Sequence, residues 1–175
     1  MPTQGRTSRR STEPNVRAAG YFIIENSMLC LACNVRTTVY GFALAAGYES
    51  LEPIDDSDDL EDAEEETASA WDVPGVAAVL SYVEYLPDPV ALRIQDLSPH
   101  YRVDRDPDKH WYWMNHCQHC GKPMDEEEVH EPLEGPFGEQ PYEGWDHFKL
   151  HEIREPFEAW AGQQCFEPGY LREPD

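Results

Sequence analysis

Residues 30–34 read CLACN and residues 117–121 read CQHCG, so the chain carries two Cys-x-x-Cys pairs. Two residues between cysteines let a tight turn aim both sulfurs at one metal ion, and four thiolates form a closed tetrahedral zinc site. The residue after each pair often takes a positive φ, which Asn34 and Gly121 tolerate well. We call these two stretches the first and the second knuckle and expect them to bind one zinc ion. The predicted ligands are Cys30, Cys33, Cys117 and Cys120.

The second knuckle, with His116 before it and Lys122 after it, resembles the knuckle of zinc-ribbon proteins, and the first knuckle resembles its partner less closely. Zinc ribbons normally carry their pairs closer together, so residues 34–116 would be a large insertion. The aromatic residues that run into Asn115-His116-Cys117 are similar to those of uncharacterised bacterial proteins, a likeness that implies no activity. Closing so long a loop costs roughly 4 kcal/mol of chain entropy, whereas structural zinc supplies about 10–16 kcal/mol. Zinc binding can therefore offset the separation.

Other interpretations of the cysteines are two disulfides, two redox dithiols or unrelated buried thiols. Cys165 stands apart from both pairs, and a lone cysteine is typically a buried small hydrophobe or an idle thiol. His116 lies beside the second knuckle and His119 within it, where histidines are usually exposed or support a ligand by hydrogen bonding, although either could replace a cysteine. His147 and His151 could bind a second metal ion, but a strand does not bring residues four apart close together, so a solvated face is favoured.

The chain is strongly acidic, with 35 Asp and Glu against 13 Lys and Arg and a formal net charge of −22. Residues 52–66 form a dense acidic run without a basic residue, which predicts a mobile surface loop. A second acidic cluster at 125–134 follows the second knuckle. Phosphate binding depends on Lys and Arg, so direct nucleic-acid binding is not expected. The negative electrostatic field of these side chains instead favours a basic protein partner, unless the acidity only maintains solubility.

The chain has 175 residues, a length that suits a single domain. We expect a disordered basic tail at 1–18, a single zinc-binding domain at 19–165 with a flexible acidic loop at 52–69, and a C-terminal tail at 166–175. The N-terminal segment lacks the apolar stretch of a signal peptide, and no membrane segment is visible. Paired cysteines without export signals predict a cytoplasmic protein, where thiols stay available to metal.

Two runs rich in aromatic and β-branched residues, 21–26 and 37–44, flank the first knuckle and predict the strands of a hairpin that holds the metal at its turn. Residues 71–86 fit both helical and strand spacing, and a strand near their end is favoured. Residues 111–116 alternate as a strand that leads into the second knuckle. Their aromatic side chains are expected in the core, with an aromatic binding groove as the alternative.

A helix is predicted from an Asp88 N-cap, with Pro89 at its first position, to Ser98. Its apolar face would comprise Val90, Ile94 and Leu97. Residues 147–151 predict a short strand, and residues 156–162 predict one or two helical turns that end at a glycine. These elements give an α+β fold: a small antiparallel sheet with zinc-ribbon-like knuckles on hairpins and one or two covering helices.

Motifs of several enzyme classes are missing from the sequence. There is no deaminase pattern, phosphate loop or nucleophile elbow, and neither Cys-x-x-Cys pair has the strand and long helix of a thioredoxin-like site. We therefore expect a non-enzymatic, acidic zinc-binding protein that acts as a protein-interaction module, for example an inhibitor or immunity-type protein that docks on a basic partner. The alternatives are a dithiol redox protein and a purely structural, zinc-stabilised subunit.

Overall fold

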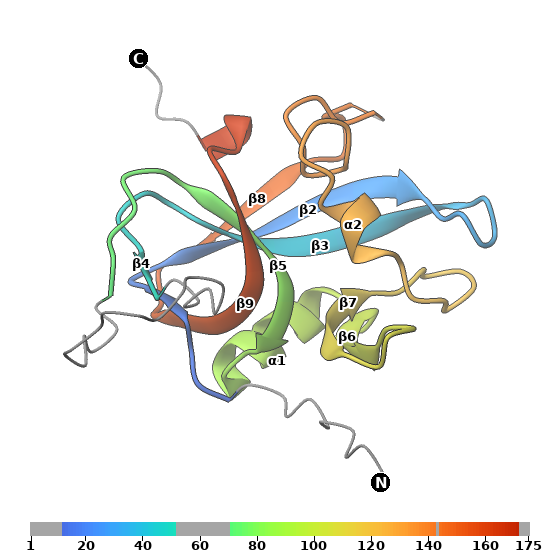
Figure 1. The fold of residues 1–175 in the computed structure, drawn as a ribbon. Coiled ribbons are helices and arrows are strands. Elements are labelled where there is room, and N and C mark those ends of the chain that lie inside the picture. The colour runs from blue at the N-terminus through green and yellow to red at the C-terminus, as the bar shows by residue number, and fades with distance from the viewer. Residues whose placement is uncertain (1–11, 52–70, 143, 172–175) are drawn as a thin grey trace, which may run out of the picture.

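The computed structural model describes residues 12–51, 71–142 and 144–171. Their strands form a nine-stranded sheet in which every pairing is antiparallel. The expected α+β fold is confirmed (Figure 1). The elements are β1 (Val16–Ala18), β2 (Tyr21–Leu29), β3 (Arg36–Leu44), β4 (Glu49–Ser50), β5 (Ala78–Tyr85), α1 (Asp88–Leu97), β6 (Tyr101–Arg105), β7 (Trp111–Asn115), α2 (Glu126–Val129), β8 (Lys149–Ile153), β9 (Phe157–Phe166) and a 3-10 turn, Gly169–Leu171.

The sheet branches at β5. The main path runs β4-β1-β9-β5-β3-β2-β8, while β7 also pairs with β5 and carries β6 on its other edge. Near its start β5 pairs with β3, and at Val83 it pairs with Trp113 of β7. This branch brings the end of β7, and the second knuckle after it, close to β3, although the two strands are far apart in sequence.

The β2–β3 hairpin confirms the two strands expected around the first knuckle. Its register runs from Phe22 opposite Ala43 to Leu29 opposite Arg36, so residues 30–35 form the turn. Both faces of the hairpin are covered, because the neighbours Ile23 and Ile24 are fully buried in different apolar clusters. Side chains that pack on both faces fix the hairpin rigidly and place the first knuckle at its outer end (Figure 1).

One apolar cluster contains the buried face of α1 together with Tyr101 of β6 and Trp113 of β7. Val90 and Ile94 are buried as expected, whereas Leu97 is 41% exposed and leaves the predicted face. The N-cap is Pro87, and Asp88 is already helical, so the predicted helix start is wrong by one residue. The rings of β7 are largely buried, which confirms core packing for Tyr112 and Trp113, but Trp111 is exposed.

The other cluster lies under α2, which connects to the sheet through a buried carboxylate. Glu126 is buried, and its Oε1 accepts a hydrogen bond from the backbone N–H of Tyr82 in β5 at 3.0 Å. Val129 and Phe137 add apolar contact with the hairpin residues Ile24 and Val39. The segment that follows the second knuckle is thereby packed onto the same sheet that carries the first knuckle.

The helical turns predicted at 156–162 are wrong, because residues 157–162 belong to strand β9. Phe157, Ala159 and Ala161 are buried while their neighbours are more exposed, a period of two that suits a strand. Backbone pairing with β1 on one side and β5 on the other satisfies the polar groups that a helix would have satisfied internally. The predicted strand at 147–151 is present but shifted to Lys149–Ile153.

The predicted boundaries also need correction. Val16–Ala18, which the sequence placed in the N-terminal tail, forms β1 between β4 and β9. The expected C-terminal tail at 166–175 begins instead with the end of β9 and a 3-10 turn whose Tyr170 packs against the core under α2. The expected disorder at 1–11 and the acidic loop at 52–69 lie outside the described residues. Neither described α-helix has the length and apolar composition needed to cross a membrane.

Candidate metal centre

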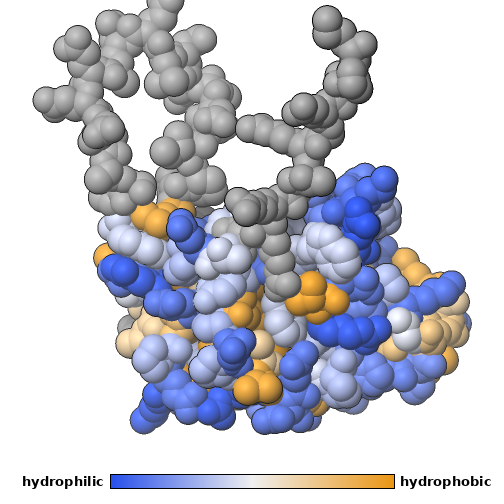
Figure 2. Space-filling model, turned by 90° about the horizontal axis from the view of Figure 1, so that it is seen from below, coloured by the Kyte–Doolittle hydropathy of each residue, from blue (hydrophilic) through white to orange (hydrophobic). Residues whose placement is uncertain are grey.

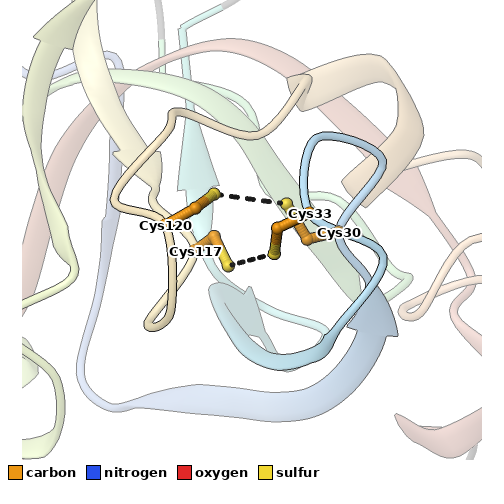
Figure 3. A group of neighbouring side chains, drawn as sticks. All are labelled: Cys30, Cys33, Cys117 and Cys120. Carbon is orange, nitrogen blue, oxygen red and sulfur yellow. Dashed lines mark hydrogen bonds between the residues drawn. The ribbon is translucent and has the colours of Figure 1, made fainter.

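The two knuckles meet and place four sulfur atoms together (Figure 3). The Sγ atoms of Cys30, Cys33, Cys117 and Cys120 all lie within 4.8 Å of one another. Across the knuckles, Cys30 and Cys120 are 3.8 Å apart and Cys33 and Cys117 are 3.7 Å apart. A regular tetrahedron of sulfurs about 2.3 Å from a central zinc ion has edges of about 3.8 Å. The cluster therefore has the composition and size of a site that could hold a metal ion.

Both knuckles use the same backbone hydrogen bonds. In the first, Asn34 N–H donates to the Cys30 carbonyl at 2.7 Å, and in the second, Gly121 N–H donates to the Cys117 carbonyl at 2.9 Å. The closing residues Asn34 and Gly121 have φ values of 58° and 72°, which confirms the left-handed conformation expected at both positions. Hydrogen bonds within each turn and a residue that tolerates positive φ thus orient the two sulfurs of that turn.

Hydrogen bonds between β3 and the second knuckle keep the two turns in register. Gln118 N–H donates to Thr37 Oγ1 at 3.0 Å, and His119 Nε2 donates to the Arg36 carbonyl at 3.0 Å. These bonds run directly from the second knuckle to the strand that follows the first, so they hold the cysteine pairs opposite each other independently of a metal ion.

A buried asparagine adds a third link at the same place. Asn115 Oδ1 accepts from the backbone N–H of Tyr40, and its Nδ2 donates to the Tyr40 carbonyl, both at 2.8 Å. The amide side chain therefore replaces one rung of a strand ladder between β7 and β3. Sequence analysis missed this role, since an Asn that ends an aromatic strand carries no signal of the residue it pairs with.

The thiols influence one another's ionisation. Burial opposes ionisation of Cys117, but the backbone N–H groups of Cys120 and His119, together with the Cys33 thiol, lower its pKa to about 6. Desolvation, reinforced by hydrogen bonds with the neighbouring sulfurs and opposed by the Val35 backbone, raises the pKa of Cys33 to about 12. Ionisation of one thiol, Cys117, is thus favoured. A divalent cation would be needed to compensate the negative charge of four thiolates.

The histidines beside and within the second knuckle are not in the cluster. His116 is buried, and its Nε2 donates to Asp104 Oδ2 at 2.8 Å, while the His119 ring points at β3. Both therefore support the site by hydrogen bonding, as the sequence favoured. Asp104 was not anticipated, because nothing in its sequence neighbourhood marks it as the partner of a residue on the next strand.

Other candidate groups do not form a second site. His151 Nε2 and Lys149 Nζ both bond to Glu25, at 2.8 and 2.9 Å, so this histidine lies in an ion-pair group rather than on a merely solvated face. Cys165 is partly buried against the core under α2, and burial raises its pKa, consistent with an idle thiol. Within residues 12–51, 71–142 and 144–171, the four cysteines are the one group of His, Cys, Asp and Glu placed to share an ion.

The four-cysteine arrangement is consistent with a zinc-ribbon-like site built from two distant segments. Its chemistry is that of a closed site, because four protein ligands around one ion leave no position for a substrate. Comparisons of the chain with protein-family models, with curated proteins and with solved structures gave no significant match.

Proposed function

We propose that this chain is a zinc-stabilised, acidic interaction module that docks on a basic protein and has no catalytic chemistry of its own. The observation that carries the proposal is the closed cysteine cluster in a chain of net charge −22. Zinc is the expected ion because a tetrahedral set of four thiolates suits its borderline-soft character. In a concrete form, the protein would act as an inhibitor or immunity-type protein that covers a basic surface.

The distribution of ion pairs supports a net acidic surface. Several basic side chains are already paired with glutamates, namely Arg17 with Glu49, Arg93 with Glu155, Lys149 with Glu25 and Arg154 with Glu152. Pairing removes these cations from contact with phosphates, so nucleic acid is a poor candidate partner. Next to the second knuckle, helix α2 presents Glu127 and Glu128 to solvent. Such a surface accelerates association with a positively charged protein.

Salt-dependent capture tests the electrostatic part of this proposal. The tagged, zinc-loaded full chain is immobilised, and proteins that bind it are eluted with rising sodium chloride and identified. We expect basic proteins that are released as ionic strength shortens the Debye length from about 10 Å at 0.1 M salt to about 3 Å at 1 M. If the amount of partner recovered does not change with ionic strength, electrostatic docking is refuted.

Metal analysis with thiol counting tests the chemical part. One zinc per chain is the expected result, with the four cluster thiols unreactive toward a small reagent until the metal is removed. Cobalt substitution should give the visible absorption of tetrahedral thiolate coordination. A reversible dithiol-to-disulfide couple in the metal-free protein, together with no bound zinc after purification in reducing buffer, would instead favour the redox alternative.

A further inference from the structure

A groove of about 550 Å³ lies beside the first knuckle and contributes nothing to the metal site. One side is formed by the end of β2 and the knuckle itself, through Met28, Leu29 and Leu31. The opposite side comes from the segment after α2 and includes Pro141 and Tyr142. Leu31 is 75% exposed and Tyr142 is 86% exposed, so both offer large apolar surfaces to a partner. Apolar colouring also gathers at the projecting end of the β2–β3 hairpin, next to hydrophilic surroundings (Figure 2).

The charged side chains that line the groove are all acidic: Glu128, Glu131 and Glu134. Backbone N–H groups of Glu134, Leu133 and Gly135 hold the pKa of Glu131 below its usual range despite some desolvation, so this carboxylate stays ionised. One cation approaches the other end, where Arg36 Nη1 donates to Ser27 Oγ at 2.8 Å. The groove is thus apolar along its length and acidic along the side that adjoins α2.

The groove is formed before a ligand binds. Asn26 Nδ2 donates to the Pro136 carbonyl at 2.7 Å, which fastens the far wall to β2. Tyr142 N–H donates to the Glu134 carbonyl at 2.9 Å and closes the loop that forms this wall. Gly135 permits the tight turn, because a Cβ there would lie 2.6 Å from the Glu131 carbonyl oxygen. A preformed wall reduces the ordering cost of binding.

We propose that this groove binds a short segment of a partner protein in which apolar side chains are flanked by Lys or Arg. The proposal rests on the proposed function, since it names the part of the acidic module that recognises its basic partner. Charge complementarity argues for this occupant. A second copy of this chain would bring its own net charge of −22 against the glutamates. A purely basic segment would leave Leu31 and Tyr142 without contacts, whereas an apolar segment with cationic flanks satisfies both sets of side chains.

Labelled synthetic peptides test the proposal by fluorescence anisotropy on the zinc-loaded full chain. The probe is a nine-residue peptide that alternates Leu with Lys. One comparison peptide replaces every Leu with Ser and keeps the charge, and another replaces every Lys with Gln and keeps the leucines. We expect the Leu/Lys peptide to bind at least tenfold more tightly than either one, and we expect salt to weaken it.

Substitutions in the groove locate the binding. Leu31→Ser and Tyr142→Ala should each weaken binding of the Leu/Lys peptide about tenfold. Truncating a side chain that anchors a partner costs more than about 1 kcal/mol of binding free energy. Leu92→Ser is the matched control, since Leu92 is 62% exposed on α1, away from the groove. Glu134→Gln should weaken binding a few-fold at low salt, and its control, Asp96→Asn, should not. Circular dichroism and the melting temperature verify that the variants fold.

The outcomes separate this inference from the proposed function. If the Ser/Lys peptide binds as tightly as the Leu/Lys peptide and the groove variants bind like wild type, the groove is not the binding site, although acidic docking would stand. If neither lysine peptide binds at low salt, or if the Leu/Gln peptide binds as tightly as the Leu/Lys peptide, the inference about the groove is overturned, while acidic docking is decided by the salt-dependent capture experiment. Loss of binding in Leu31→Ser and Tyr142→Ala, with the Leu92→Ser control unchanged, supports the groove.

Discussion

Removing the metal ion should lower the stability of the protein without unfolding it at room temperature. The metal-free chain keeps its sheet, since two apolar clusters are buried on its faces and do not involve zinc. The knuckles also stay opposite each other, because Gln118, His119 and Asn115 each bond to β3 independently of the ion. These bonds contribute about 1 kcal/mol each. We therefore expect a bound ion to add stability to a site that is already assembled.

The size of the effect follows from mass action. A ligand that binds the folded chain alone, at a free concentration 1,000 times its dissociation constant, stabilises it by about 4.1 kcal/mol. In a chain of this length each kcal/mol shifts the melting temperature by about 2–4 °C. Chelation of zinc from the purified protein should therefore lower the melting temperature by about 8–16 °C. Replacing the buried ligand Cys117 with Ser should produce a similar loss and abolish the response to added zinc.

Scanning calorimetry at fixed free zinc concentrations measures both effects. Cys165→Ser is the matched control, since this cysteine lies outside the cluster and its variant should keep the full response to zinc. The reasoning is refuted if the melting temperature of the wild-type protein does not depend on zinc. It is also refuted if Cys117→Ser still responds to zinc as the wild type does.

The remaining predictions concern the residues that hold the site in place. Asn115→Leu should cost about 2–6 kcal/mol in urea unfolding, because both backbone groups of Tyr40 would be left buried without partners. Gly135→Ala should lower the melting temperature, because its Cβ would overlap neighbouring backbone, whereas Gly75→Ala, with open space around it, should not. A hydrogen bond from a buried histidine lowers the pKa of Asp104 below its usual 3.8. Its carboxylate therefore stabilises the fold above that pH, and this advantage over Asp104→Asn should disappear as unfolding is measured at progressively lower pH.

Local patterns were sufficient to predict the knuckles and the hairpin that carries the first of them. Two cysteines with two residues between them, followed by Asn34 or Gly121, specify a turn that has its own hydrogen bonds. The β-branched and aromatic runs around the first knuckle likewise left only the strand interpretation. That the two pairs meet could be inferred because chemistry demands four ligands, not because the sequence revealed the path of the chain between them.

The missed elements depend on contacts between distant segments. Residues 156–162 are few, and their apolar positions fit a helical turn as well as a strand, so pairing with β5 and β1 decided their conformation. Val16–Ala18 is a strand because β9 and β4 lie on either side of it. A stretch of three residues is too short for its sequence to predict this pairing. The groove escaped prediction for the same reason, since its walls come from the hairpin and from the segment that includes Tyr142.

The positions of the four cysteines indicate what the proposed metal site would do in this molecule. A closed four-thiolate site would offer no place for a substrate, so on our proposal it would act through the position of neighbouring side chains. Cys30 lies between Leu29 and Leu31, which both line the groove. An ion bound to Cys30 would fix the turn from which these side chains project, and ligands from the second knuckle would tie that turn to the start of α2 and its glutamates. Metal binding, and recognition of a partner segment that carries both apolar and basic side chains, would then both depend on the contact between the two knuckles.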